Sequence, residues 1–221
     1  MKRQQFLQTL MSAVLGGVLG SAQAGSYDDF FVAIKRNDGS GITQLLQRGF
    51  DPNTVNPSGE YGLNLAIKEP SLKVVDALVN WPATKAEVRN RQDESPLMLA
   101  ALQGFTELCA KLIAKGADVN KPGWTPLHYA STHGHLDVMR LLLEHYAYID
   151  AASPNGTTPL MMASNYGTAS AVKLLLEAGA DPTLKNAQGL TAIDFSQLQE
   201  RKDVTEIIAA FIRGRQTKGT W

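Results

Sequence analysis

Apolar residues recur along the chain at helical spacing, in short segments separated by polar, turn-rich stretches. Within residues 125–150, this spacing gives Leu127 and Ala130 in a first segment and Val138 and Leu142 in a second. Apolar side chains three to four positions apart lie on one face of a helix. The stretches between segments are rich in Gly, Pro, Asn and Asp, which favour turns. The pattern therefore predicts an all-α fold built from pairs of short helices.

The helix pairs are predicted to follow a regular period. One tetrapeptide recurs in variant forms that begin 30, 33 and 33 positions apart, at 95–98, 125–128, 158–161 and 191–194. Each copy begins with Ser or Thr, which cap helices, and three continue with Pro, which is favoured at the first helical position. A pair of helices this short cannot bury its apolar faces alone. The period therefore predicts a stack in which neighbouring pairs share one core.

The repeating unit resembles the ankyrin repeat, whose first helix starts with Thr-Pro-Leu-His-x-Ala. The string from Thr125 to Ala130 matches this start, with Tyr129 at the free position. The resemblance is strongest over 86–183, and the copies outside that range are degenerate, as the terminal units of a finite stack require. It implies an ankyrin-repeat solenoid of about six helix-turn-helix units with short β-hairpin-like connectors. We expect an ankyrin-repeat domain over 25–213, with units near 27–60, 61–94, 95–124, 125–157, 158–190 and 191–213, and a polar C-terminal tail over 214–221.

The connector between the third and fourth expected units is unusually short. Only residues 121–124 separate Asn120 from Thr125, three residues fewer than in the neighbouring connector. We therefore expect a truncated turn that projects Trp124 at the edge of the stack.

The first 24 residues have the pattern of a cleaved secretory signal peptide. Lys2 and Arg3 precede an apolar stretch over about 6–19, and residues 22–24 read Ala-Gln-Ala. The apolar stretch holds polar residues and is too short to span a bilayer, so no stable membrane insertion is expected after cleavage behind Ala24. We expect the mature protein in the periplasm of a Gram-negative bacterium, with secretion as the alternative.

Charge and cysteine content narrow the classes of function. The chain has 21 basic and 21 acidic residues, so it lacks the basic excess typical of nucleic-acid-binding proteins. Cys109 is the single cysteine, which leaves no internal disulfide to stabilise an exported fold. Its apolar neighbours on a predicted second helix indicate a core position instead of a reactive thiol.

Histidines are the strongest candidates for chemistry, and all four lie in one unit: His128, His133, His135 and His145. No carboxylate or thiol joins them at metal-ligand spacing. The family resemblance implies structural roles, with the His128 ring bonded to neighbouring backbone and His135 capping the second helix. No nucleophile motif or phosphate loop occurs either. We therefore expect no catalytic residue, no cofactor and no metal, and hence no enzyme.

The resemblance implies that a protein partner contacts the connector tips and the exposed positions of the first helices. Aromatic residues on a rigid surface are frequent energetic anchors of interfaces. The alternative is that these are ordinary exposed residues without a shared role. Aligned on the repeat, the candidate protein-binding residues are Leu102, Gln103, Trp124, Thr132, His133, Asn165 and Tyr166.

These observations favour a monomeric, non-catalytic protein-binding scaffold in the periplasm, with a partner that the sequence does not identify. In size and export the chain also resembles bacterial periplasmic ankyrin proteins that accompany catalases, which implies an accessory role in defence against oxidative stress. The alternative function is that of an immunity protein that neutralises a toxin delivered to the periplasm.

Overall fold

The computed structural model describes residues 25–218, so the expected signal peptide and the last three residues lie outside the described chain. The chain divides between Thr84 and Lys85 into two compact parts, which we treat separately. Over the described residues the secondary structure is helical without a named strand, and a single β-bridge joins Val55 and Tyr61. None of the helices in 25–218 is both long and apolar enough to cross a membrane.

The N-terminal part contains two helix pairs. Its core includes Phe30 and Ile34 of the first helix together with Ile67 and Leu78, all fully buried. A side chain at Gly62 would overlap the Phe30 ring, so the missing Cβ lets the two first helices approach closely. The helices span 25–35, α2 Gly39–Gln47, α3 Gly62–Lys68 and α4 Leu72–Val79.

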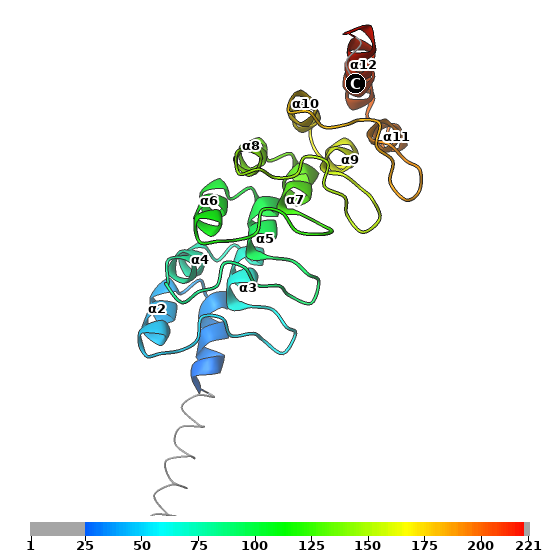
Figure 1. The fold of residues 1–221 in the computed structure, drawn as a ribbon. Coiled ribbons are helices and arrows are strands. Elements are labelled where there is room, and N and C mark those ends of the chain that lie inside the picture. The colour runs from blue at the N-terminus through cyan, green and yellow to red at the C-terminus, as the bar shows by residue number, and fades with distance from the viewer. Residues whose placement is uncertain (1–24, 219–221) are drawn as a thin grey trace, which may run out of the picture. The chain divides into compact units, whose positions relative to one another are not determined.

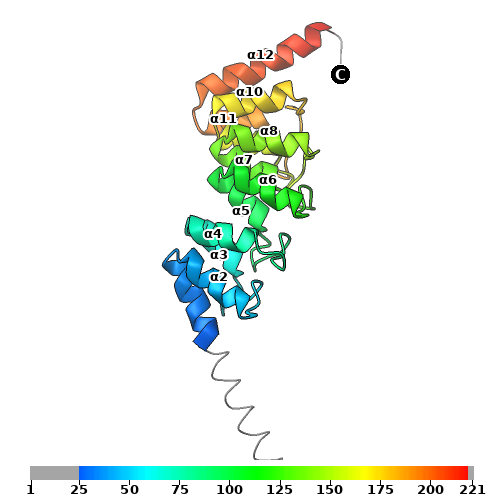
Figure 2. The same ribbon diagram turned by 90° about the vertical axis from the view of Figure 1, so that its left-hand side faces the viewer.

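The C-terminal part contains four helix pairs arranged in two layers. The first helices of successive pairs pack side by side in one layer, and the second helices do so in the other (Figure 1 and Figure 2). The described residues therefore form six helix-turn-helix units, which confirms the fold class predicted from the sequence. The first helices are α5 Pro96–Gln103, α7 Pro126–His133, α9 Pro159–Asn165 and α11 Ala192–Leu198; the second helices are α6 Thr106–Ala114, α8 Leu136–Glu144, α10 Ala169–Glu177 and α12 Lys202–Lys218.

The repeated tetrapeptide starts the first helices as predicted. The hydroxyls of Ser95 and Thr158 accept hydrogen bonds from the N–H groups of residues 98 and 161, at 3.2 and 3.3 Å. Gly104 and Gly134 end α5 and α7 in the left-handed conformation, with φ of 74° and 69°. Gly167 differs, because its φ is not positive. A Cβ there would instead collide with the Ser131 carbonyl oxygen of the preceding unit.

In three units, a side chain just before the second helix bonds to the preceding unit. Ser71 Oγ donates to the Ile34 carbonyl at 2.9 Å, and His135 Nε2 donates to the Leu102 carbonyl at 2.9 Å. Arg201 fills the same position in the last unit and donates to three carbonyls at the end of α9. These bonds satisfy carbonyls that a helix C-terminus leaves without partners. His135 occupies the N-cap position of α8, as the resemblance implied, but its side chain makes no cap bond there, because the ring reaches back to α5.

The connectors close into hairpin-like turns. In four of them, one backbone N–H donates to the carbonyl four residues later, at 2.9–3.2 Å: 56 to 60, 90 to 94, 153 to 157 and 186 to 190. Among the described backbone hydrogen bonds, none closes residues 120–124 in this way. The predicted truncated turn before Thr125 is therefore confirmed.

The C-terminal boundary differs from the sequence expectation. The expected domain end at 213 and polar tail from 214 are not separate segments, because α12 continues to Lys218 and runs past the end of α10 (Figure 2). Arg, Gln and Lys are good helix formers, so the polar composition of this stretch does not end the helix. The Arg215 guanidinium also lies 4.9 Å from the Phe211 ring centre, which supports the extension. The last three residues of the expected tail fall outside the described chain.

Candidate protein-binding surface

An apolar depression of about 260 Å³ lies on three successive first helices of the C-terminal part. We call it the apolar groove. One of its lining residues comes from α5, one from the truncated connector, three from α7 and one from α9. Its lining residues are Leu102, Trp124, His128, Tyr129, Thr132 and Met162.

His128 forms the floor of the groove and is completely buried. The Thr125 N–H donates to its Nδ1 at 3.1 Å, so Nε2 carries the ring proton and donates to the Thr157 carbonyl at 2.9 Å. Burial lowers the pKa of His128 to about 4, so the floor carries no charge at neutral pH. The predicted structural role of this histidine, with its ring bonded to backbone, is confirmed.

Trp124 and Tyr129 form two walls of the groove. The Trp124 ring is half-buried and meets the His128 ring edge-on, with ring centres 5.2 Å apart. The Tyr129 hydroxyl donates to Glu94 Oε1 at 3.4 Å, which places a carboxylate at the edge of this wall. Burial, and then the negative charge of Glu94, raise the pKa of the Tyr129 hydroxyl to about 12. The phenol therefore stays neutral and donates its proton.

The structure brings three of the seven predicted residues together: Leu102, Trp124 and Thr132 all line the groove. The other four do not line it. Gln103 and His133 are exposed, and the His133 ring stacks on His135 with centres 5.7 Å apart. Tyr166 is 61% exposed, whereas Asn165 has its side-chain oxygen buried without a hydrogen-bond partner.

Sequence reasoning missed two lining residues, Tyr129 and Met162. Both occupy the free position of the repeated helix start, three residues before Thr132 and Asn165 respectively. Residues three apart lie on the same face of a helix. Helical spacing applied to the candidate positions would therefore have found them.

Two exposed tyrosines outside the groove were also missed. Tyr146 is 85% exposed and Tyr148 69% exposed, at the end of α8. Tyr146 adopts the left-handed conformation with φ of 62°, where three other units have glycine. The Asn120 side chain fixes this turn, since it donates to the Tyr146 carbonyl and accepts from the Tyr148 N–H, both at 2.8 Å.

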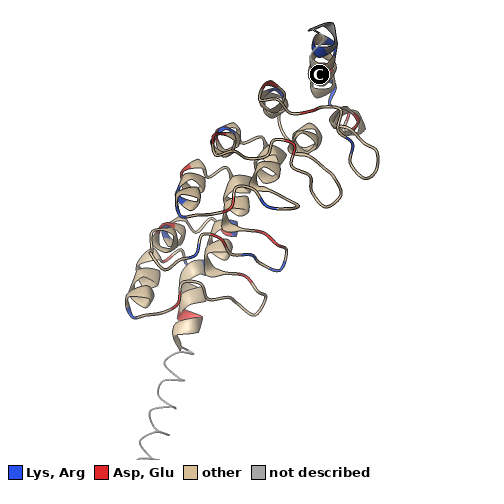
Figure 3. Ribbon diagram, in the orientation of Figure 1, with Lys and Arg blue, Asp and Glu red and all other residues tan. Residues whose placement is uncertain are grey.

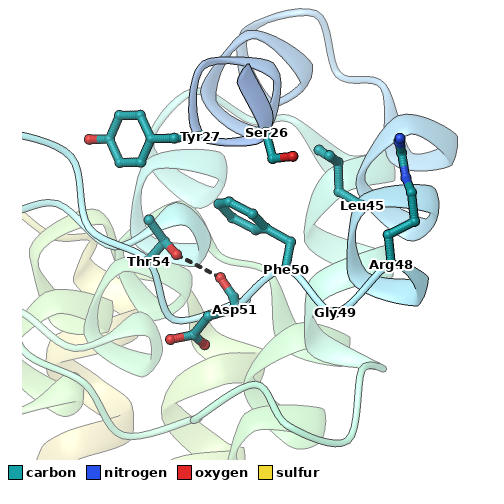
Figure 4. Close-up of a pocket in the computed structure, with 8 residues that line it drawn as sticks. All are labelled: Ser26, Tyr27, Leu45, Arg48, Gly49, Phe50, Asp51 and Thr54. Carbon is teal, nitrogen blue, oxygen red and sulfur yellow. Dashed lines mark hydrogen bonds between the residues drawn. The ribbon is translucent and has the colours of Figure 1, made fainter. Parts of the chain in front are cut away.

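A second depression, of about 440 Å³, lies in the N-terminal part between the first helix, the end of α2 and residues 49–54 (Figure 4). The Phe50 ring occupies its centre and packs against Phe30, with ring centres 4.8 Å apart. Its polar groups are bonded locally, because Thr54 Oγ1 donates to the Asp51 carbonyl and the Tyr27 hydroxyl to the Val55 carbonyl. No set of polar groups converges on a ligand position here.

The burial of the single thiol and the grouping of the potential metal ligands bear on whether the described residues form a reactive site. Cys109 is completely buried, as predicted, and burial raises the pKa of its thiol to about 12, so the reactive thiolate is not populated at neutral pH. Within residues 25–218, no three His, Cys, Asp or Glu side chains gather in a metal-ligating cluster. Figure 3 shows basic and acidic residues interspersed along both parts of the chain.

The repeats have counterparts in known proteins. The family model for ankyrin repeats (3 copies) matches residues 30–122, 63–153 and 119–186. The crystal structure of an ankyrin repeat protein has a TM-score of 0.71 and 29% sequence identity, over 82% of this chain and 96% of that one.

Two curated relatives are much longer than this chain. The B-cell lymphoma 3 protein homolog of Mus musculus is 30% identical over 159 residues, which cover 69% of this chain and 36% of that protein. Glycerophosphocholine phosphodiesterase of Schizosaccharomyces pombe is 30% identical over 112 residues, 49% of this chain and 10% of that enzyme. The similarity therefore spans about a third of one relative and a tenth of the other.

Proposed function

Because the chain belongs to the ankyrin-repeat family, we propose that it is a non-catalytic protein-binding scaffold that holds its partner at the apolar groove. The observation that carries the proposal is the groove itself. Trp124 and Tyr129 line its walls and are half-buried. Trp124 belongs to the truncated connector, and Tyr129 occupies the free position at the start of α7. Large aromatic side chains in such a setting are typical anchors of protein interfaces.

Capture from the native host tests this function. Immobilised wild-type protein, Trp124→Ala and Tyr146→Ala are each incubated with the same periplasmic extract. Tyr146 is the matched control, because it is a large exposed aromatic residue outside the groove. We expect a protein retained by the wild type and by the control variant, but not by Trp124→Ala. Equal retention of the partner by all three proteins would show that the groove is not part of the binding surface.

We further propose that the protein acts in the periplasm after cleavage behind Ala24. The support is the basic start, apolar stretch and Ala-Gln-Ala sequence of the first 24 residues. The buried Cys109 fits such a compartment, because a core thiol is protected from oxidation. Mass spectrometry of protein from the native host should find a chain that starts at Gly25. Soluble protein that retains Met1 would overturn the proposal.

An accessory role in oxidative-stress defence would act through binding. A thiol-based reaction with peroxide would need a thiolate, and Cys109 is buried with its thiol pKa raised to about 12. A strain that lacks the protein should survive peroxide less well, and wild-type protein should restore survival where Trp124→Ala does not. Full rescue by Trp124→Ala would show that the protective role does not depend on the groove. Normal survival of the strain that lacks the protein would show that the protein has no such role.

A further inference from the structure

We propose that Met162 is a reversible oxidation site, and that its conversion to the sulfoxide weakens partner binding at the apolar groove. The effect on binding rests on the proposed function, whereas the choice of the methionine that reacts does not. The oxidant is a hydroperoxide, of which hydrogen peroxide is the simplest member.

Four methionines lie within residues 25–218, and they differ in their access to solvent. Met98 and Met161 are 1% exposed, and Met139 is completely buried. Met162 is half-buried and lines the apolar groove. A small oxidant dissolved in water reaches a side chain where that side chain meets solvent. In this part of the chain, Met162 is therefore the methionine that the oxidant reaches in the folded state.

The sulfur atoms of two buried methionines are also engaged in hydrogen bonds. The Ser95 N–H donates to Met98 Sδ, and the Thr158 N–H donates to Met161 Sδ, both at 3.4 Å. The lone pairs of a thioether sulfur are also the nucleophile that attacks a peroxide, so these bonds add to the protection that burial gives. The fold therefore protects Met161 and leaves its immediate neighbour Met162 accessible.

The position of Met162 in its unit does not require a methionine. It is the free position of the helix start, which four other units fill with Leu65, Leu99, Tyr129 and Phe195. Apolar or aromatic bulk thus suffices at this position. Met162 supplies the only thioether among the residues that line the groove.

The reaction transfers one oxygen atom. The thioether sulfur attacks one oxygen of hydrogen peroxide, the S–O bond forms as the O–O bond breaks, and the second oxygen leaves as water after it takes up the proton of the first. Sulfur loses two electrons and the peroxide gains them. Methionine sulfoxide reductases reverse the change with electrons from a dithiol, so the modification can be removed.

The sulfoxide puts a polar oxygen into an apolar lining. Both ring nitrogens of His128 are already bonded to backbone groups, and Tyr129 donates its hydroxyl to Glu94. Water hydrates the sulfoxide oxygen in the free protein, but a partner that covers the groove would bury it without compensation from these groups. We expect oxidation to weaken binding about tenfold or more, because an unpaired polar group is costly to bury.

Peptide mapping tests the site of oxidation. The full mature protein is treated with hydrogen peroxide, once folded and once in denaturant, and tandem mass spectrometry follows the sulfoxide at each methionine with time. In the folded protein we expect the sulfoxide to accumulate at Met162 while Met161 remains a thioether. In denaturant the two should react alike. Equal oxidation of the two in the folded protein would overturn the inference.

The affinity of the partner captured from periplasmic extract tests the consequence. It is measured for the wild type, Met162→Leu and Met139→Leu, each before and after peroxide, with circular dichroism to verify the fold. Peroxide should weaken binding by the wild type and by Met139→Leu, and a methionine sulfoxide reductase with dithiothreitol should restore it. Met162→Leu should keep its own untreated affinity, because leucine has similar bulk and no sulfur.

The outcomes separate this inference from the proposed function. Selective oxidation of Met162 with unchanged affinity overturns the effect on binding and leaves the groove as a protein-binding surface. A peroxide-induced loss of affinity that persists in Met162→Leu assigns the sensitivity to another residue, and also overturns it. If Trp124→Ala binds the partner as tightly as the wild type, the proposed function fails, and the effect of oxidation on binding fails with it.

Discussion

At the scale of single residues, the His128 ring joins the start of its own helix to the connector that follows the unit. Its Nδ1 accepts from Thr125 in its own unit, and its Nε2 donates to the Thr157 carbonyl of the next connector. The resemblance of residues 125–130 to the ankyrin helix start implied this backbone-bonded role for His128, because the motif has a histidine at its fourth position. The left-handed conformation of Tyr146 was missed, and its one signal in the sequence is the glycine at the equivalent position of three other units.

The buried His128 predicts a pH dependence of stability. Burial lowers its folded-state pKa to about 4, whereas the unfolded chain takes up the proton near 6.5. The histidine therefore opposes folding increasingly as the pH falls from 6.5 to 4, by up to about 3 kcal/mol. Denaturant unfolding across this range should show the loss, and His128→Met should reduce it, because Met98 and Met161 fill the equivalent position in neighbouring units. An unchanged pH dependence in His128→Met would contradict the assignment.

Tyr146 predicts a stabilising substitution. A non-glycine residue in the left-handed region is strained by roughly 1–2 kcal/mol, and the exposed ring contributes little packing in return. Tyr146→Gly should therefore raise the free energy of unfolding by about 1 kcal/mol, measured by urea unfolding. Tyr148→Gly is the matched control, since Tyr148 has no positive φ and glycine there should not stabilise. A loss of stability in Tyr146→Gly would show that the ring packs in solution.

At the scale of helices, local signals determined most boundaries. Ser or Thr followed by Pro marked the starts of α5, α7 and α9, and Gly104 and Gly134 marked two of the ends. One boundary was missed: α12 continues through a polar stretch where its Phe211 and Arg215 side chains contact each other. Gly167 follows α9, and the closeness of the Ser131 carbonyl leaves no room for a Cβ there.

The second helices are predicted to depend on their buried faces. Leu142 of α8 is completely buried, so Leu142→Ala should leave a cavity and lower the free energy of unfolding by about 2–5 kcal/mol. Leu198→Ala provides the control, because Leu198 is 64% exposed and its loss should change stability by less than ~0.5 kcal/mol. Chemical denaturation of both variants measures the difference. Similar values for the two would mean that burial does not hold the stack together.

At the scale of the whole molecule, function depends on how successive units are placed. The sequence predicted the period, the number of units and the truncated turn, because each follows from residues within one unit or its connector. The groove combines side chains from three units, so its membership depends on stacking geometry that no single repeat encodes. Leu102, Trp124 and Thr132 were predicted from their positions in the repeat and line the groove. His133 and Tyr166 were predicted in the same way but do not line it.

The affinity of a captured partner for Trp124→Ala tests the central claim most directly. Isothermal titration of the wild type and of the variant, with circular dichroism to verify that both are folded, gives the ratio of dissociation constants. Loss of an aromatic anchor should cost about 2 kcal/mol of binding, a roughly thirtyfold weaker complex. Met162→Lys, which puts a charge into the same apolar groove, should weaken binding at least as much. If both variants are folded and bind the partner with wild-type affinity, the groove is not the protein-binding surface.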